Sequence, residues 1–131
     1  MIGSSAQIIA EHKRKLLAVA RTSIEMTAKG VVGRWAVDTG SSANSWIPNI
    51  GSFRARYVET TGGDISPALA AIDRIVVRIE PGDVFTHGNG APYAAVLEFH
   101  GGSQRQMPNG AMRITLAMHQ QTTDEAVRLN R

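Results

Sequence analysis

Hydrophobic residues near the start of the chain recur at the spacing of one helix face. They are Ile9, Leu16, Val19, Ala20, Ile24 and Val31. Steps of three, four and seven residues place such side chains on one side of an α-helix. Ser4-Ser5-Ala6-Gln7, just ahead of them, has the pattern of a capping box. The sequence therefore predicts a long amphipathic helix over about residues 4–30, which Gly30 and Gly33 are expected to end or bend.

The polar face of this predicted helix is basic. It carries His12, Lys13, Arg14, Lys15 and Arg21 against Glu11 and Glu25. One interpretation is a solvated face supported by acid–base pairs four residues apart. The other is a surface that meets an acidic neighbour or DNA.

The middle of the chain is rich in turn residues. Asp38-Thr39-Gly40 predicts a turn in which the Asp38 side chain caps a short helical turn over residues 41–45. Trp46 to Gly51 reads as a strand, and Pro48 forbids it a central place in a sheet. Residues 52–66 predict an exposed loop with an extended piece near Tyr57.

A second helix is predicted from Ser66, with Ser66 as its cap and Pro67 at its first position. The β-branched run at residues 75–79 fits either the end of this helix or a strand. Residues 83–87 predict a short strand that leads to the turn dipeptide Asn89-Gly90.

The last third of the chain predicts two more helices. One begins at Pro92, presents Tyr93, Val96 and Leu97 on one face, and stops at Gly101-Gly102. The other covers about residues 108–128. Tyr93 is expected to anchor the first of these segments in the core.

Composition narrows the class of protein. With 131 residues, 43% of them hydrophobic, the chain predicts one globular domain, 1–131. The absence of cysteine excludes a disulfide scaffold, a thiolate zinc site and a cysteine nucleophile. No secretory signal and no membrane span are expected. The net charge of +3 permits contact with nucleic acid without requiring it.

Glu98, in a mostly apolar run, is the most conspicuous candidate for chemistry. A general acid or base is one interpretation, and an ion pair or a cap at a subunit contact is the other. The second is favoured because no set of catalytic partners is evident. We expect Glu98 to pair with an arginine or a backbone donor.

Three further chemical hypotheses are weak. His87, Glu98 and His100 could bind a metal only if the fold brought them together. Asp38-Thr39-Gly40 also occurs in aspartic proteases, but here it is single and follows a long helix. Phe53-Arg54-Ala55-Arg56-Tyr57 mixes basic and aromatic residues as base-stacking segments do. The sequence thus predicts no catalytic residue, no metal site and no cofactor.

Three segments, in this order, resemble one family of virus structural proteins. They are Asp38-Thr39-Gly40 with Asn44-Ser45-Trp46, then Pro92-Tyr93-Ala94 with Leu97-Glu98-Phe99 and Gly101, and finally Gln106-Met107-Pro108-Asn109-Gly110-Ala111-Met112. Pro81-Gly82-Asp83 and Asn89 match as well. Over about residues 35–120 the chain is similar to the tail-completion, or neck, proteins of long-tailed phages, the group of the lambda gene-Z-type minor tail protein. It departs from them at Phe99-His100, where Tyr-Gly is usual, and in the spacing of Ser103 and Met112.

The resemblance implies an α+β fold, a small antiparallel sheet packed with the long N-terminal helix, one or two short helices and a C-terminal helix. It implies a structural virion protein rather than an enzyme, in a homo-oligomeric ring expected to hold six copies. Its partners would be the head connector or stopper and the tail terminator or tail tube. Genomic DNA would pass through the ring non-specifically, and no membrane would be involved. The protein would lie in the virion, and in the host cytoplasm during assembly.

The resemblance also selects residues. Structural or assembly roles are expected for Asp38, Gly40, Asn44, Trp46, Pro92, Tyr93, Glu98, Gly101, Pro108 and Gly110. Arg54 and Arg56 are expected to contact the DNA channel or a partner. A tail terminator ring and a small basic nucleic-acid-binding protein stay open as alternatives. A hydrolase that uses Glu98 with a histidine is a third.

Overall fold

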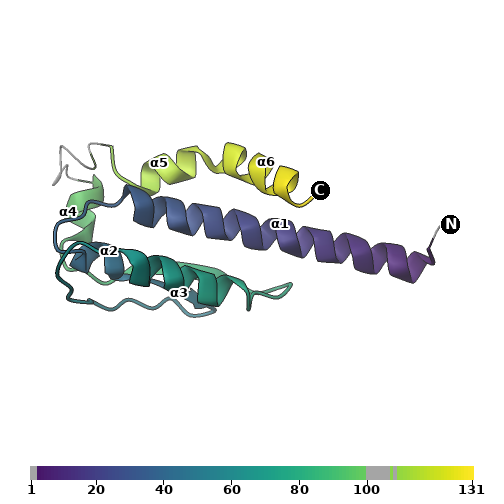
Figure 1. Ribbon diagram of the computed structural model, residues 1–131, viewed down its shortest axis with the longest axis horizontal. Coiled ribbons are helices and arrows are strands. Elements are labelled where there is room, and N and C mark those ends of the chain that lie inside the picture. The colour runs from purple at the N-terminus through teal and green to yellow at the C-terminus, as the bar shows by residue number, and fades with distance from the viewer. Residues whose placement is uncertain (1–2, 100–106, 108) are drawn as a thin grey trace.

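The computed structural model describes residues 3–99, 107 and 109–131. Its elements are α1 Ser5–Arg34, α2 Ser41–Asn44, β1 Trp46–Ile50, α3 Ser66–Val76, β2 Phe85–Asn89, α4 Ala94–Phe99, α5 Met112–Ala117 and α6 His119–Leu129. Figure 1 shows α1 as the central layer, with α5 and α6 along one side and α3 with the sheet along the other. The predicted α+β fold with a long N-terminal helix and a small antiparallel sheet is confirmed.

Helix α1 begins where the sequence predicts and ends later. The Ser4 side chain accepts a hydrogen bond from the Gln7 N–H, and the Gln7 side chain accepts one from the Ser4 N–H, which completes the capping box. Gly30 and Gly33 lie inside the helix, so of the two predicted effects, ending the helix or bending it, the first is wrong. A Cβ added at Gly30 would lie 3.2 Å from Cγ2 of Thr115 on α5. The glycine therefore lets α5 approach closely.

Asp38 does not cap α2 as predicted. The residue ahead of this helix is Gly40, with φ 88°, and none of the described side chains caps it. Thr39 Oγ1 accepts from the N–H of Ser41, the first residue of α2, at 3.3 Å. Asp38 is exposed. The left-handed backbone at Gly40 explains why glycine suits this position.

The sheet has two strands in the described residues, β1 and β2, paired antiparallel with Trp46 opposite Asn89 and Pro48 opposite His87. Pro48 is tolerated because each strand has only one partner. Residues 75–79 are not a strand: α3 ends at Val76 and a turn follows. Ser66 is the first helical residue rather than the cap, which is Ile65.

The segments after β2 differ in detail from the prediction. Pro92 lies in the turn before α4, which begins at Ala94. The predicted C-terminal helix is two helices, because the chain breaks helical geometry at Met118, with φ −92° and ψ 8°. The core lies between α1, α3 and the sheet. It is built around Val32, Ile72, Trp35, Trp46, Ala43 and Met107.

Candidate functional site: a carboxylate cap and an apolar groove on the long helix

Glu98 is buried, with 3% of its surface exposed, and its carboxylate holds the start of α5. Its Oε2 accepts from the N–H groups of Ala111 at 2.8 Å and Met112 at 3.1 Å. Its Oε1 accepts from the N–H of Arg113 at 2.8 Å. These are N–H groups that the first turn of a helix leaves without partners. The carboxylate thus joins α4 to α5 by charge-assisted hydrogen bonds.

Arg113 completes this contact. Its Nε lies 3.5 Å from Glu98 Oε1, and its guanidinium also donates to the Glu98 carbonyl oxygen. The same guanidinium lies 5.5 Å from the ring centre of Phe99, a cation–π contact. The prediction that Glu98 pairs with an arginine or a backbone donor is confirmed, since it does both. An acid whose two oxygens accept three backbone N–H groups suits a structural cap rather than a general base.

Gly110 belongs to the same contact. Its φ is 79°, and a Cβ there would lie 2.5 Å from Glu98 Oε1. Any larger residue would therefore displace the carboxylate. A structural or assembly role was also predicted for Gly101 and Pro108. Both lie outside the described residues, as does His100.

A second buried polar centre surrounds Asn44. Its Nδ2 donates to the Asp64 carbonyl at 2.8 Å, and its Oδ1 accepts from the Ala68 N–H at 3.1 Å. Two serines continue this network toward the loop after β1. Ser45 Oγ accepts from the Val58 N–H, and Ser41 Oγ accepts from the Thr60 N–H, both at 2.8 Å. Asn44 therefore joins α2 to α3, and its predicted structural role has a physical basis.

Two aromatic residues of the predicted structural set, Trp46 and Tyr93, lie in different surroundings. Trp46 is buried and meets the ring of Trp35 edge-on, with centroids 5.1 Å apart. Tyr93 is 41% exposed and contacts the ring of Tyr57 rather than the core, so its prediction as an anchor is wrong. The buried face of α4 carries Glu98, with Leu97 partly buried beside it.

Arg54 and Arg56 lie in the exposed loop between β1 and α3. The loop passes close to β2: a Cβ at Gly88 would clash with the ring of Phe53, and one at Gly90 would clash with the backbone of Arg56. The arginines are exposed, and Phe53 and Tyr57 beside them are 65% and 40% exposed.

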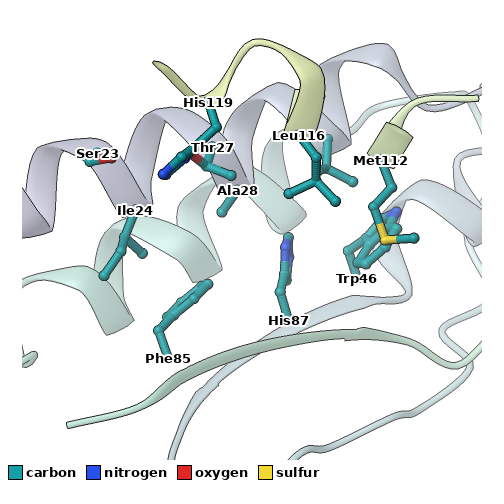
Figure 2. A pocket seen from close by; sticks show the side chains of 11 residues that line it. Ser23, Ile24, Thr27, Ala28, Trp46, Phe85, His87, Met112, Leu116 and His119 are labelled. Carbon is teal, nitrogen blue, oxygen red and sulfur yellow. The ribbon is translucent and has the colours of Figure 1, made fainter. Parts of the chain in front are cut away.

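An apolar groove of about 330 Å³ opens between α1, β2 and the α5–α6 segment. Figure 2 shows Phe85 and His87 reaching into it from β2, Ile24 from α1, and Leu116 and His119 from the opposite wall. Sequence reasoning missed this groove. The alternation of Phe85 and His87, which places both on one face of β2, is the signal that could have indicated it.

His87 is the unusual residue of the groove. Its Nε2 is buried and has no hydrogen-bond partner among the described residues. Burial lowers the pKa of His87 from 6.5 to about 4, because the charged form loses its hydration. Its ring lies against Trp46, with centroids 4.8 Å apart. The groove therefore holds a neutral imidazole at pH 7.

The first half of α1 projects beyond the rest of the molecule (Figure 1). Every residue from Gly3 to Leu16 is exposed, and Ile8, Ile9 and Leu16 are each more than half exposed. From Leu17 onward the helix is partly buried against its neighbours, including α3 and α6. We call Ile8, Ile9 and Leu16 the projecting stripe.

The described residues contain no group of three His, Asp or Glu side chains that could hold a metal ion. Of the helices described, none combines the length and the apolar character that crossing a bilayer requires. Comparisons with protein-family models, curated proteins and solved structures find no match to this chain.

Proposed function

We propose that this chain is a structural protein that forms a ring in the neck of a long-tailed phage, where it completes the tail and enables head–tail joining. It would lie in the virion, and in the host cytoplasm during assembly. The ring would be homo-oligomeric and would contact the connector or stopper on one side and the tail terminator or tube on the other. Genomic DNA would pass through it without sequence readout.

The projecting stripe carries this proposal. A helical segment with few tertiary contacts is marginal in water. Here it presents three large aliphatic side chains to solvent, of which Leu16 also borders the turn at Pro81 and Gly82. A structural protein that is completed by assembly accounts for such a segment. The motif residues fit the same role, since Asn44 and Glu98 are both engaged in joining elements of the fold.

Deleting the coding sequence from the genome that carries it tests the proposal. We expect tails of normal length that fail to join heads, visible by electron micrography. Overlong tails would instead assign the chain to the tail terminator, the neighbouring ring of the neck. Unaltered, infectious particles would contradict both assignments. Micrographs of the purified protein are expected to show rings.

A non-specific nucleic-acid-binding protein is the second candidate. The exposure of Arg54 and Arg56 between Phe53 and Tyr57 favours it, because such loops combine phosphate contacts with stacking. Affinity for DNA would then fall steeply with salt. Removing both charges, by Arg54→Gln with Arg56→Gln, would lower the slope of log K against log salt by about 2. A slope that does not depend on these arginines would reject this candidate.

A further inference from the structure

The projecting stripe and the groove both belong to α1, and this restricts what can cover them. The stripe spans residues 8–16, and the groove is lined by α1 residues 23–31. A continuous helix keeps these two stretches at a set distance along one axis. The stripe can therefore never reach the groove of its own chain.

The two surfaces match in length and chemistry. Ile8 to Leu16 is a stretch of nine residues, as is Ser23 to Val31, so each covers eight helical steps, or about 12 Å along a helix axis. Ile9 and Leu16 are seven residues apart, the spacing at which an amphipathic helix places anchors in an apolar groove. The groove volume of about 330 Å³ is about twice that of a ~150 Å³ cavity that accepts benzene. It suits two aliphatic side chains inserted from a helix that lies across its mouth.

We propose that the projecting half of α1 of one copy docks on the groove of a second copy, with Ile9 and Leu16 inserted beside Phe85, Leu116 and His87. The occupant is the same chain because it carries both matching surfaces. His87 is compatible with an aliphatic neighbour because its imidazole is neutral there. The stripe and the groove are different surfaces, so the contact is heterologous and repeats from copy to copy unless it closes.

The docking of one copy on another does not require the proposed ring. Only the number of copies in the closed assembly rests on the proposed function. Repeated docking around a rotation axis closes a ring. Two copies that exchange their projecting halves reciprocally would close a dimer instead. Docking and ring formation can therefore fail separately.

Cysteine crosslinking tests the docking directly, because the chain contains no cysteine. Ile9→Cys and Leu116→Cys replace side chains that are 54% and 56% exposed, so neither is expected to disturb the monomer. The two variants are purified separately, mixed and treated with a short bismaleimide. A control mixture pairs Ile9→Cys with Val77→Cys, which is 68% exposed beyond α3.

The docking predicts a crosslinked pair in the Ile9→Cys and Leu116→Cys mixture and little in the control. If oligomers form but the two mixtures crosslink equally, or if Ile9→Cys links only to itself, the docking is wrong. A protein that stays monomeric at all concentrations, alone and with tail tubes, would also overturn it.

A chain that carries both substitutions then separates the two proposals. Closed species of more than two copies would support both the docking and the ring. Crosslinked dimers alone would support the docking and contradict the ring. Rings seen by micrography without any crosslink would support the proposed function and overturn the docking.

Ile9→Glu provides a second measurement. Glutamate keeps the helix but puts a charge into the groove, so self-association should weaken at least about tenfold by sedimentation equilibrium. Val77→Glu should leave association unchanged. Equal effects of the two substitutions would contradict the docking.

Discussion

The two ends of α1 differ in how they are stabilised. At its C-terminal end the helix lies between α5–α6 and the sheet, and two polar centres, at Glu98 and Asn44, tie the surrounding elements together. At its N-terminal end it has a side-chain cap, and the described residues up to Leu16 are exposed, with only Lys13 and Leu16 bordering the turn at residues 80–83. One end is stabilised by hydrogen bonds between distant residues, and the other only by local ones. Stability of the monomer should therefore be concentrated at the first end.

Glu98→Ala should have the largest effect. It leaves three backbone N–H groups without their acceptor and Arg113 without the carboxylate, and we expect a loss of about 3–5 kcal/mol in the free energy of unfolding, measured with urea. Glu125→Ala is the control, because this carboxylate pairs with Arg128 near the surface and is worth about 1 kcal/mol or less. Equal losses would mean that Glu98 does not hold α5.

Acid should weaken the same end of the molecule. His87 has a folded-state pKa of about 4 and an unfolded value of 6.5, so the unfolded chain binds a proton that the folded chain excludes. Stability is full above about pH 6.5 and falls as the pH drops from there to 4, by about 3 kcal/mol. The variant His87→Phe should lack this part of the loss. Urea titrations of both proteins at pH 7 and pH 4.5 measure it, and parallel losses would contradict it.

Asn44→Ala should cost about 2 kcal/mol, since it leaves the Asp64 carbonyl and the Ala68 N–H without their side-chain partner. The matched control is Asn49→Ala, which removes a hydrogen bond from Nδ2 to the carbonyl of Ser52 in an exposed setting. We expect a clearly smaller thermal shift for the control. If Asn49→Ala were the more damaging change, the network around Asn44 would not be a main tie.

Ser4→Ala should have the smallest global effect. It removes the capping box at a cost of about 1 kcal/mol to the helix end, but this end supports nothing else in the monomer. Amide hydrogen exchange should become about fivefold faster near the start of α1, while the urea midpoint stays unchanged. Ser5→Ala, inside the first turn, should change neither. A shifted midpoint would show that the projecting half is coupled to the core.

The sequence predicted best where the forces are local. Helix α1 follows from its apolar spacing and from Ser4 and Gln7, and β1 follows from its short extended run with Pro48. Gly30 was misread because glycine usually interrupts helices, whereas here the approach of Thr115 from a distant segment makes it useful. Propensity contains no information about such a neighbour.

The sequence predicted only part of the candidate site, because some of its contacts join residues that are distant in the chain. The solitary acid in an apolar run indicated that Glu98 needs a donor, but its partners lie 13 to 15 residues further along the chain. The prediction for Tyr93 was wrong because it assumed that the apolar side chains mark the buried face of α4. Glu98 is buried instead, because its carboxylate accepts hydrogen bonds from the N–H groups at the start of α5. The predicted cap at Asp38 is absent among the described contacts of α2, where Gly40, with its left-handed backbone, occupies the N-cap position.

Residues 53–56 pass close to Gly88 and Gly90, so the position of Arg54 and Arg56 depends on residues that carry no charge. The arginines supply the charge, but two residues of a different segment, which have no side chain, determine where that charge lies. Replacing Gly90 with alanine would shift Arg56, and replacing Gly88 would shift Phe53 and Arg54, without altering the net charge of +3. Such a substitution moves the positive potential of this surface without changing the charge of the protein. It therefore tests whether binding at this surface depends on the position of the arginines or only on their charge.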